Sequence, residues 1–570
     1  MTIGDYLLTR LREVGVSHLI GVPGDFNLAF LDQVLAFGGI EWVGACNELN
    51  AAYAVDGYAR IRGVGALLVT YGVGDLSALN GIAGANAEHV PLVCISGVPP
   101  LHAIQNRQIL HHTSGTGDFE DVMTCVSQFT AAQSRITPAN AAMEIDRLLL
   151  TCLREKRPVY LQMPSEIPYL ETAPPAAPLA QENAMSDPVQ TDRLVELIAE
   201  RVLSAKRPAL LVDADAHRFG LRPLLCSLGE TCGIPFASLL SGRSVFNEQH
   251  PLYRGIYAGR SSAPEARETI EESDCLITMG ARFFDATTGF FSQQIPQEST
   301  ISLYPFSAAV EGRVFEGITA REVLALLGRR LASACLRGAG PASYTALSTD
   351  ASADSPTKDL SGAPLTHERL WPRVARFLRE GDIVLADNGT AQSGLAGIRL
   401  PAGATYVGQP TWGSIGYALP ALLGSLLAEP SRRQVLFIGD GSFQMTAQEV
   451  STILRHNLRP IIFLINNRGY TIERVILGPH AAYNDIQNWR YAELAAQMAD
   501  GRCVRGFTVT NEAELELALE QAHDATEFTL IELMMGKLDA PIGLQRMGPQ
   551  AAAYDYGERG PQKPAGVSRA

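Results

Sequence analysis

Short uninterrupted apolar runs alternate with amphipathic stretches along most of the chain, and this alternation constrains the fold more than any other feature. Runs such as "GALLVTYG", "PALLVDADA" and "PIIFLINN" lack the polar–apolar alternation of a strand with one face in water. Stretches such as "DYLLTRLREVG" lie between such runs and predict helices with one apolar face. Continuous apolar strands separated by helices are typical of parallel sheets covered on both faces. The sequence therefore predicts an α/β protein with doubly wound parallel sheets.

Two stretches without apolar periodicity divide this pattern into three blocks. Residues 171–188 are rich in Pro and Ala, and residues 337–364 form a polar Gly/Ser/Pro run. A chain of 570 residues is too long for one hydrophobic core. We predict domains at residues 1–172, 189–336 and 365–555, followed by a disordered tail at residues 556–570.

Composition argues against several classes of function. The net charge of −14 does not suit a nucleic-acid surface, because phosphate binding needs clustered Lys and Arg. No stretch reaches the roughly 20 apolar residues that cross a bilayer, and the N-terminus lacks the apolar core of a signal peptide. The nine cysteines include no CxxC pair. We expect a cytoplasmic protein with reduced thiols and without nucleic-acid or membrane partners.

Polar residues follow two consecutive predicted strands in the C-terminal block. The stretch "IGDGSFQMTAQEVSTILRHNLRPIIFLINN" places Asp440 after one strand and Asn467 after the next, with one predicted helix between them. A right-handed crossover brings the carboxyl ends of both strands side by side, where open α/β sheets bind ligands. Gly439 and Gly441 allow close approach of a ligand, and Ser442 begins a helix whose free N–H groups suit an anion.

The oxygen atoms available at this place favour a hard cation. A carboxylate, an amide oxygen and a backbone carbonyl suit Mg²⁺ or Ca²⁺ carrying a phosphate, with Mg²⁺ preferred because it is usually shared with phosphates. A Rossmann-type nucleotide or FAD site, or a plain glycine turn, is the alternative. GDGS followed by NN across strand–helix–strand resembles the thiamin-diphosphate signature. That resemblance implies that Asp440, Asn467 and the carbonyl of Gly469 bind Mg²⁺, which holds the diphosphate.

A thiamin-diphosphate enzyme also needs an acid that protonates the far ring nitrogen of the aminopyrimidine, so that the thiazolium can lose its C2 proton. A carboxylate in an apolar pocket can share a proton in this way. Glu48, in "EWVGACNELNAAYAVDGYARIRG", begins an Ala-rich predicted helix. An acid in a first helical turn usually only complements the helix dipole. Together with the downstream signature, Glu48 is the predicted activator.

Further stretches extend the resemblance to one family. "VGVSHLIGVPGDFNLAFLDQV", "NELNAAYAVDGYAR", "YGVGDLSALNGIAGANAEHVPLVCISGVP" and "WGSIGYALPALLG" resemble the thiamin-diphosphate-dependent pyruvate, indolepyruvate and phenylpyruvate decarboxylases. The resemblance implies a pyrimidine-binding, a central Rossmann-like and a diphosphate-binding domain. It also implies a cofactor between two subunits, with Glu48 from one and Asp440 from the other. A homodimer is then the minimal active unit, and a homotetramer is expected.

Four titratable residues match the proton relay of this family: Asp25 in "GVPGDF", His111 and His112 in "ILHHT", and Glu473 in "GYTIE". Adjacent histidines are commonly a solvated loop pair, so the assignment depends on the whole set. Acetohydroxyacid synthases resemble the architecture but lack the His pair and this Glu. Once CO₂ has left, a carbon must gain a proton and a hydroxyl must lose one, and His and carboxyl side chains can carry both.

The resemblance assigns the remaining cofactor contacts to two loops. In "TWGSIG", Gly413 offers its carbonyl to the 4′-amino group, and Ile415 forces the cofactor into a bent shape; an ordinary buried Ile is the alternative. Tyr470 and Thr471, which follow Gly469, complete the predicted cofactor-binding set.

The predicted substrate pocket gives conflicting indications. Ile472 and Ile476 match enzymes that restrict the pocket to pyruvate, whereas Asn388, Gln392 and Ser393 stand where family members often carry Phe or Trp. A lost ring leaves room, and filling an apolar pocket is worth roughly 1–3 kcal/mol. We predict an enzyme for aromatic, branched or longer-chain 2-oxo acids such as phenylpyruvate, indolepyruvate or 2-oxoisovalerate. Pyruvate is the alternative substrate.

The C-terminal stretch departs from the family pattern. Where relatives carry a closing helix, this chain has Gly543, Gly548 and Pro549, which disfavour one. Ile542 and Met547 are further candidates for the pocket wall, and a lid function is left open.

Two other classes of function are weaker. An FAD- or nucleotide-dependent oxidoreductase is disfavoured because no GxGxxG follows a strand in the central block. A non-catalytic regulatory subunit is disfavoured because Glu48, Asp440, Asn467 and the relay residues are all present.

Overall fold

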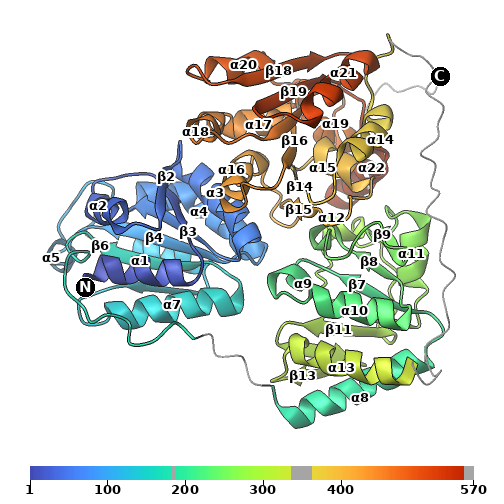
Figure 1. Ribbon diagram of the computed structural model, residues 1–570, viewed down its shortest axis with the longest axis horizontal. Helices are drawn as coiled ribbons and strands as arrows, with labels where there is room; N and C mark the ends of the chain where they lie inside the picture. Colours follow the sequence, from blue (N-terminus) through green and yellow to red (C-terminus); the bar gives the residue numbers. More distant parts are fainter. Residues whose placement is uncertain (181–185, 336–361, 558–570) are drawn as a thin grey trace.

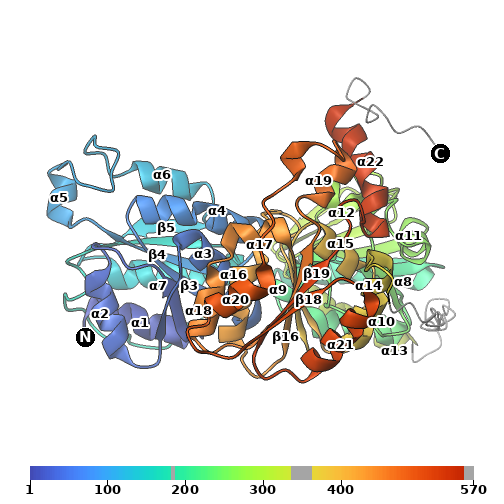
Figure 2. The same cartoon turned by 90° about the horizontal axis from the view of Figure 1, so that it is seen from above.

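The computed structural model describes residues 1–180, 186–335 and 362–557 and contains three α/β domains in chain order (Figures 1 and 2). Each domain is built around one sheet, with six strands in the first, seven in the middle and six in the third. The fold class predicted from the sequence is confirmed. Most of the linker predicted at residues 337–364 lies outside the described residues. Within the described residues, no helix combines the length and apolar character needed to span a bilayer.

The first domain is an all-parallel sheet covered on both faces. Its strands are β1 (His18–Gly21), β2 (Glu41–Gly44), β3 (Gly65–Thr70), β4 (Leu92–Val98), β5 (Ala132–Arg135) and β6 (Val159–Pro164). Its helices are α1 (Ile3–Glu13), α2 (Leu28–Phe37), α3 (Glu48–Arg62), α4 (Val73–Ala87), α5 (Leu101–Gln105), α6 (Asp121–Ser127) and α7 (Ala141–Glu155). Leu67 and Val69 of β3 join one hydrophobic cluster, and Ala66 and Leu68 join another. Because successive residues of a strand face opposite sides, this two-sided burial explains the uninterrupted apolar runs.

The third domain repeats the strand order of the first. Its strands are β14 (Ile383–Ala386), β15 (Thr405–Val407), β16 (Gln434–Gly439), β17 (Ile461–Asn466), β18 (Val504–Val509) and β19 (Phe528–Met534). Its helices are α14 (His367–Phe377), α15 (Thr390–Ala396), α16 (Ala418–Ala428), α17 (Asp440–Thr446), α18 (Glu449–Arg455), α19 (Thr471–Ile476), η2 (Ala482–Asn484), α20 (Tyr491–Gln497), α21 (Glu512–His523) and α22 (Ile542–Tyr556). The order β15-β14-β16-β17-β19-β18 matches β2-β1-β3-β4-β6-β5 position by position. The turn after β16 therefore corresponds to the turn after β3.

The middle domain is parallel in its core and antiparallel at one edge. Its strands are β7 (Pro208–Val212), β8 (Phe236–Ser238), β9 (Tyr253–Ile256), β10 (Cys275–Met279), β11 (Thr300–Tyr304), β12 (Ser307–Val310) and β13 (Arg313–Glu316). Its helices are α8 (Pro188–Ser204), α9 (Asp215–Arg218), α10 (Arg222–Cys232), η1 (Leu240–Gly242), α11 (Pro264–Glu271), α12 (Asp285–Thr288) and α13 (Ala320–Cys335). β11, β12 and β13 pair antiparallel, which a purely parallel prediction misses. Glu311 and Gly312 join β12 to β13 with φ values of 52° and 75°, as a two-residue hairpin requires.

The single helix predicted between Asp440 and Asn467 is two helices, α17 and α18. No Gly or Pro interrupts residues 442–456, so the break has a tertiary cause. Thr446 donates its hydroxyl to the Gly416 carbonyl (2.8 Å), and Glu449 accepts a hydrogen bond from the side chain of Asn50 (2.7 Å). Between these contacts Ala447 and Gln448 keep α-type backbone angles, and the chain tightens locally, with the Val450 N–H bonded to the Ala447 carbonyl (3.2 Å).

Helices α3 and α16 join the first and third domains (Figure 1). The Tyr417 hydroxyl donates to the buried carboxylate of Asp56 (2.5 Å), which also accepts from Arg60 (2.6 Å). The hydroxyls of Tyr53 and Ser414 lie 2.6 Å apart. Asp56 is fully buried, and a charged and a neutral donor both serve its Oδ1, which offsets part of the cost of burying the carboxylate.

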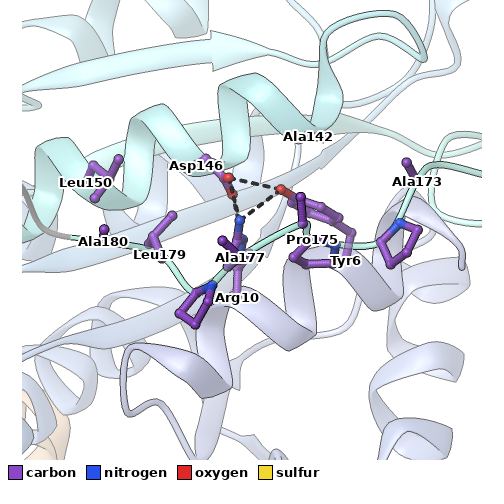
Figure 3. A pocket seen from close by; sticks show the side chains of 13 residues that line it. Tyr6, Arg10, Ala142, Asp146, Leu150, Ala173, Pro175, Ala177, Leu179 and Ala180 are labelled. Atoms are coloured by element: carbon purple, nitrogen blue, oxygen red, sulfur yellow. Dashed lines mark hydrogen bonds and ion pairs between the residues drawn. The ribbon is translucent and has the colours of Figure 1, made fainter.

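The described part of the first linker packs against the first domain instead of lying loose. Residues 173–180 cross α1 and α7 and close a cavity of about 400 Å³ with Tyr6 and Arg10 (Figure 3). The Arg10 guanidinium donates to both carboxylate oxygens of Asp146 (2.8 and 2.7 Å) and to the Ala177 carbonyl (2.9 Å). Its charge is satisfied within the protein, so this cavity is a seam of the fold and is distinct from the candidate active site.

The C-terminal stretch forms a helix, contrary to the expectation drawn from its Gly and Pro residues. α22 packs against α15 and α19, and it contains Gly543, Gly548 and Pro549. A Cβ atom at Gly548 would stand 2.6 Å from the Val475 carbonyl oxygen, so the glycine allows close packing on α19. Of the predicted tail, Tyr556 closes the helix, and residues 558–570 lie outside the described residues.

Candidate functional site

The tips of β16 and β17 bring together the polar residues singled out in the third domain. The two strands are parallel neighbours, with Gly439 paired to Ile465. Asp440 begins α17 directly after β16, and Asn467 directly follows β17. The Gly469 N–H donates to Oδ2 of Asp440 (3.0 Å), so the two loops meet at the carboxylate.

Three groups that carry oxygen converge at this point. One terminal atom of the Asn467 amide lies 2.6 Å from the Gly469 carbonyl oxygen and 3.2 Å from Oδ1 of Asp440. If that atom is nitrogen, it donates to both oxygens. If it is oxygen, a carboxylate, an amide oxygen and a carbonyl crowd together, which is stable only around a cation. The donor set thus fits a hard divalent ion.

Burial makes the Asp440 carboxyl responsive to such an ion. Its side chain is 1% exposed, and burial raises its pKa to about 6. Backbone N–H groups oppose this rise, including Gly441, which donates to Oδ1 at 2.8 Å. The nearby Arg474 guanidinium also lowers the pKa. The protein therefore leaves a buried carboxylate only partly compensated.

Arg474, which sequence reasoning did not single out, holds the loop that follows β17. The guanidinium is 3% exposed and donates to the carbonyls of Asn467 (3.1 Å), Arg468 (2.8 Å) and Asn484 (3.0 Å). Gly469 within this loop has a φ of +131°, and a Cβ there would stand 2.0 Å from the Asn484 carbonyl oxygen. Only glycine fits this position.

Asp387 is a second residue that sequence reasoning missed, and it fixes the loop of Gly413 and Ile415. Its carboxylate accepts N–H bonds from Gly416 (3.3 Å) and Ala418 (2.8 Å), and burial raises its pKa to about 6. Gly413 has a φ of +68° and an exposed backbone, whereas Ile415 is half-buried. Asp387 directly follows β14, so the rule that located Asp440, a polar residue after an apolar strand, also points to it.

Glu48 begins α3, as predicted, and is half-buried. The Asn47 side chain caps the helix by accepting from the Asn50 N–H (2.8 Å). A Cβ placed on Gly74 would stand 3.5 Å from Oε1 of Glu48, so the carboxyl lies against the turn after β3. Glu48 and Asp440 thus belong to different domains of the chain.

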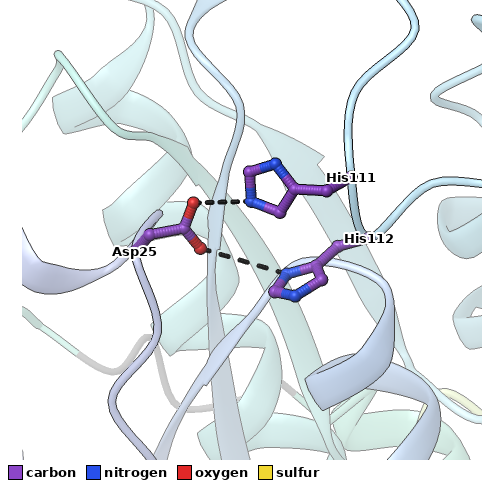
Figure 4. Close-up of side chains that lie close together, drawn as sticks. All are labelled: Asp25, His111 and His112. Carbon is purple, nitrogen blue, oxygen red and sulfur yellow. Dashed lines mark hydrogen bonds and ion pairs between the residues drawn. The ribbon is translucent and has the colours of Figure 1, made fainter.

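The structure brings three of the four predicted relay residues together (Figure 4). Nε2 of His111 lies 2.7 Å from Oδ2 of Asp25, and Nδ1 of His112 lies 3.9 Å from Oδ1. Phe26 stacks on His111, with ring centroids 5.0 Å apart. Asn27 holds the Asp25 loop by donating to the Val22 carbonyl (3.1 Å). Asp25 and His111 are exposed, so a ligand can reach them.

The fourth relay residue, Glu473, lies in the third domain. It is exposed on α19, two residues after Thr471, whose hydroxyl donates to the Lys537 carbonyl (2.8 Å). Tyr470 is half-buried, and its ring lies against Gly441. Ser442 is buried in the first turn of α17.

The predicted pocket residues lie just after β14 and on helices α15 and α19. Asn388 donates to the Gln409 carbonyl (3.3 Å), and Ile472 lies against Gly389. Gln392 is buried and donates to the Tyr406 hydroxyl (3.1 Å). Ser393 lies on α15, and its hydroxyl faces Gly543 of α22. Ile476 lies on α19, which packs against the same helix, α22.

Comparisons with known proteins agree with this arrangement. Residues 1–122 match the thiamine pyrophosphate enzyme N-terminal TPP binding domain, residues 195–319 the central domain, and residues 387–533 the C-terminal TPP binding domain. The chain resembles the solved thiamine diphosphate-dependent 4-hydroxybenzoylformate decarboxylase of Rhodococcus jostii RHA1. The TM-score is 0.75 and the identity 21%, over 94% of this chain and 99% of that one, which shows a shared fold.

Curated relatives are similar over nearly their whole length. The alpha-keto-acid decarboxylase of Mycolicibacterium paratuberculosis is 42% identical over 541 residues, covering 95% of both chains. The protein of the same name from Mycobacterium tuberculosis H37Rv is 42% identical over 545 residues, again 95% of both chains. That of Mycobacterium leprae is 40% identical over 95% of this chain and 94% of its own. This chain therefore belongs to the thiamine pyrophosphate enzyme family that includes the alpha-keto-acid decarboxylases.

Proposed function

We propose that the protein decarboxylates 2-oxo acids non-oxidatively to an aldehyde and CO₂, with thiamin diphosphate and Mg²⁺. The observation that carries the proposal is the convergence of Asp440, Asn467 and Gly469 oxygens at the tips of β16 and β17. It occurs in a chain that is 42% identical to proteins named alpha-keto-acid decarboxylase.

The chain's own groups account for holding the cofactor. Asp440, Asn467 and the Gly469 carbonyl are the proposed Mg²⁺ ligands, and the ion offsets the charge of a buried carboxylate next to a diphosphate. Gly439 has open space around its Cα, and the first turn of α17, which includes Ser442, follows it directly; the N–H groups at a helix start suit an anion.

Thiamin diphosphate, when bound, supplies a thiazolium ring that accepts the electron pair left behind by CO₂. Glu48 is proposed to hold a proton at the far ring nitrogen of the aminopyrimidine. Asp25, His111 and His112 form one cluster, in which Asp25 is within hydrogen-bond distance of His111 and 3.9 Å from His112, and these groups are proposed to pass a proton to the substrate carbon or to take one from its hydroxyl. Glu473 is proposed to complete that set from the third domain.

The side chains at the predicted pocket positions favour a substrate larger than pyruvate. Gln392 is turned to Tyr406, and Ser393 faces Gly543, so neither position presents a bulky ring. Together with Asn388, they favour aromatic, branched or longer-chain 2-oxo acids. Ile472, whose side chain lies against Gly389, and Ile476 match enzymes restricted to pyruvate and keep pyruvate as the second candidate substrate.

We infer that two copies of the chain build the site. Val73 and Leu76, beside the Glu48 half, are each 52% exposed, and Met445, on the helix that begins with Asp440, is 51% exposed. Exposed apolar side chains next to both half-sites favour a second copy as the partner. Sedimentation analysis of the purified protein distinguishes a dimer from the expected tetramer.

Mixing two inactive variants tests the shared site. A heterodimer of Glu48→Gln and Asp440→Ala chains carries one intact site and one doubly altered site. Random exchange of equal amounts should therefore restore about a quarter of the wild-type activity. If the mixture stays inactive although exchange is verified by mass, each site is formed within one chain.

A panel of 2-oxo acids tests the activity itself. Aldehyde formation is measured for pyruvate, 2-oxoisovalerate, phenylpyruvate and indolepyruvate, with and without added thiamin diphosphate and after chelation of divalent ions. We expect kcat/KM to be higher for the larger acids than for pyruvate. Absence of cofactor-dependent aldehyde from every acid overturns the proposal.

A further inference from the structure

A buried carboxyl that the proposed reaction does not use lies beneath the catalytic groups of the first domain. Asp75, in the first turn of α4, is completely buried. Oδ2 accepts hydrogen bonds from the Gly72 N–H (2.9 Å) and from the Ser96 hydroxyl (3.0 Å). Within the described residues Oδ1 has no hydrogen-bond partner. A carboxyl with this environment is costly to keep, so its presence calls for a reason.

The turn that Asp75 holds supports two predicted catalytic groups. A Cβ on Gly72 would stand 1.9 Å from the His112 carbonyl oxygen, so the backbone of the relay loop lies directly on this turn. Two residues further on, Gly74 lies against Oε1 of Glu48, 3.5 Å from the Cβ position. The turn therefore touches Glu48 on one side and His112 on the other.

The strand that leads into the turn contacts a third predicted group. Thr70, the last residue of β3, lies against Gly24, where a Cβ would stand 2.5 Å from its side chain. Gly24 directly precedes Asp25, and its N–H donates to the Asn27 side chain (3.0 Å). All three contacts come from one short segment, residues 70–74.

The third domain also carries a buried carboxyl at the corresponding edge of its sheet. Because the two sheets share their strand order, the turn after β3 is the counterpart of the turn after β16, where Asp440 lies. Each region carries a buried carboxyl that accepts a backbone N–H, although Asp440 directly follows its strand and Asp75 comes one helical turn later, in α4. In the first domain that carboxyl faces inward, towards Ser96 of β4.

We propose that Asp75 is a positioning residue, whose carboxyl fixes the 72–74 turn and thereby sets Glu48 and the His111–His112 loop relative to each other. The proposal rests on the proposed function for its catalytic consequence. Its structural part, the holding of the turn and the relay loop, is independent of the cofactor.

The surroundings of Asp75 disfavour a negative charge, so we infer that the turn depends on the hydrogen-bond acceptor Oδ2 and not on the charge of the carboxylate. Burial raises the pKa of Asp75 to about 7, the hydrogen bonds from Ser96 and Gly72 and the nearby Tyr160 hydroxyl oppose this rise, and the Glu48 charge raises the pKa further. Burial raises the pKa of the Cys94 thiol and of the Tyr71 phenol, and the nearby Asp75 charge raises both further. A neutral acceptor at Oδ2 satisfies the same two donors.

Matched variants separate positioning from general stability. Asp75→Asn keeps one oxygen for the Gly72 N–H and the Ser96 hydroxyl and places its amide at the unpartnered side. Asp75→Ala removes the acceptor. Ser96→Ala, the control, removes one donor and leaves the bond to Gly72 in place.

Hydrogen exchange of the cofactor-free protein, measured by mass spectrometry, reads out the turn directly. Asp75→Ala should speed amide exchange about tenfold in the peptides that cover residues 70–76 and 108–114, since the Gly72 N–H loses its acceptor and one ordinary hydrogen bond corresponds to about tenfold in exchange. Asp75→Asn and Ser96→Ala should leave both peptides near the wild-type rate. Unchanged exchange in both peptides of the Ala variant overturns the proposal.

The loaded enzyme supplies the second readout. The exchange of the cofactor C2 proton with solvent, which depends on Glu48, should slow at least tenfold in Asp75→Ala and recover in Asp75→Asn, with kcat affected more than KM. A variant that only loses thermal stability while C2 exchange stays at the wild-type rate refutes the positioning role. If instead the wild-type protein shows no cofactor-dependent decarboxylation, the proposed function fails while the exchange result on the free protein still decides the role of Asp75.

Discussion

Replacing Asp440 with Asn should make the cofactor-free protein more stable than the wild type at pH 8. With thiamin diphosphate and Mg²⁺ bound, the variant should instead be less stable than the wild type. Asp440 is buried and its pKa is raised to about 6 from the ordinary value of 3.8. The folded state therefore binds the proton more tightly than the unfolded state, and stability falls as the pH rises through this window. Above about pH 7 the full cost is present, about 3 kcal/mol for a shift of two units.

The Asn side chain avoids this cost but loses one acceptor. Both Asp440 oxygens accept backbone N–H bonds, from Gly441 and Gly469. An amide can serve only one of them, which costs about 1–2 kcal/mol. At pH 8 the cofactor-free variant should therefore be more stable than the wild type by about 1–2 kcal/mol. At pH 5 the wild-type carboxyl is mostly protonated in the folded state, so about 1.5 kcal/mol of that advantage disappears.

Calorimetric or fluorimetric melting at pH 5 and pH 8 measures the effect, with and without thiamin diphosphate and Mg²⁺. In the third domain, of roughly 190 residues, 1 kcal/mol corresponds to about 2–4 °C. Cofactor at a hundred times its dissociation constant should stabilise the wild type by about 2.7 kcal/mol and the variant far less, so the order of stability reverses. If the difference between variant and wild type is the same at both pH values, the raised pKa is wrong. If the variant keeps Mg²⁺-dependent cofactor binding, the ligand assignment is wrong.

Four further substitutions test other parts of the site. Glu48→Gln should leave the melting temperature within a few degrees but slow turnover by orders of magnitude; near-normal turnover removes Glu48 from the activating role. His112→Ala should slow the steps after substrate addition more than C2 proton exchange, and single-turnover kinetics with an unchanged product-forming rate exclude it from the relay. Arg474→Met removes a donor from three carbonyls, of which only that of Asn484 keeps another among the described residues, the Tyr470 N–H, and should cost the third domain about 2–4 kcal/mol together with cofactor affinity, as measured by melting and titration. Ser393→Phe should lower kcat/KM for phenylpyruvate at least tenfold relative to pyruvate, and an unchanged ratio places Ser393 outside the pocket.

The sequence predicted the parts of the site that depend on local order along the chain. Asp440 and Asn467 directly follow apolar strands, and in a parallel sheet the carboxyl ends of neighbouring strands meet at one edge. Their proximity is thus a consequence of strand–helix–strand connectivity. The same rule, applied to the residue after β14, would have found Asp387. Glu48 and the relay could be located only by resemblance, because an acid at a helix start or a pair of histidines has no specific signal of its own.

Tertiary structure decided the features that depend on what packs against a residue. Gly548 and Pro549 disfavour a helix locally, yet α22 forms because it packs on α15 and α19. The stretch between Asp440 and Asn467 reads as one helix, yet it forms two, with contacts to Gly416 and Asn50 on either side of the break.

What the sequence alone determined, then, is the class of fold, the strand ends and the identity of the groups placed there. The environment of those groups came only from the folded molecule: the raised pKa of Asp440, the bracing of its loop by Arg474, and the position of Asp75 beneath Glu48 and His112. The physical reason is that periodicity and connectivity act between neighbours in the chain, whereas burial and charge depend on residues that are distant in sequence and become neighbours only on folding.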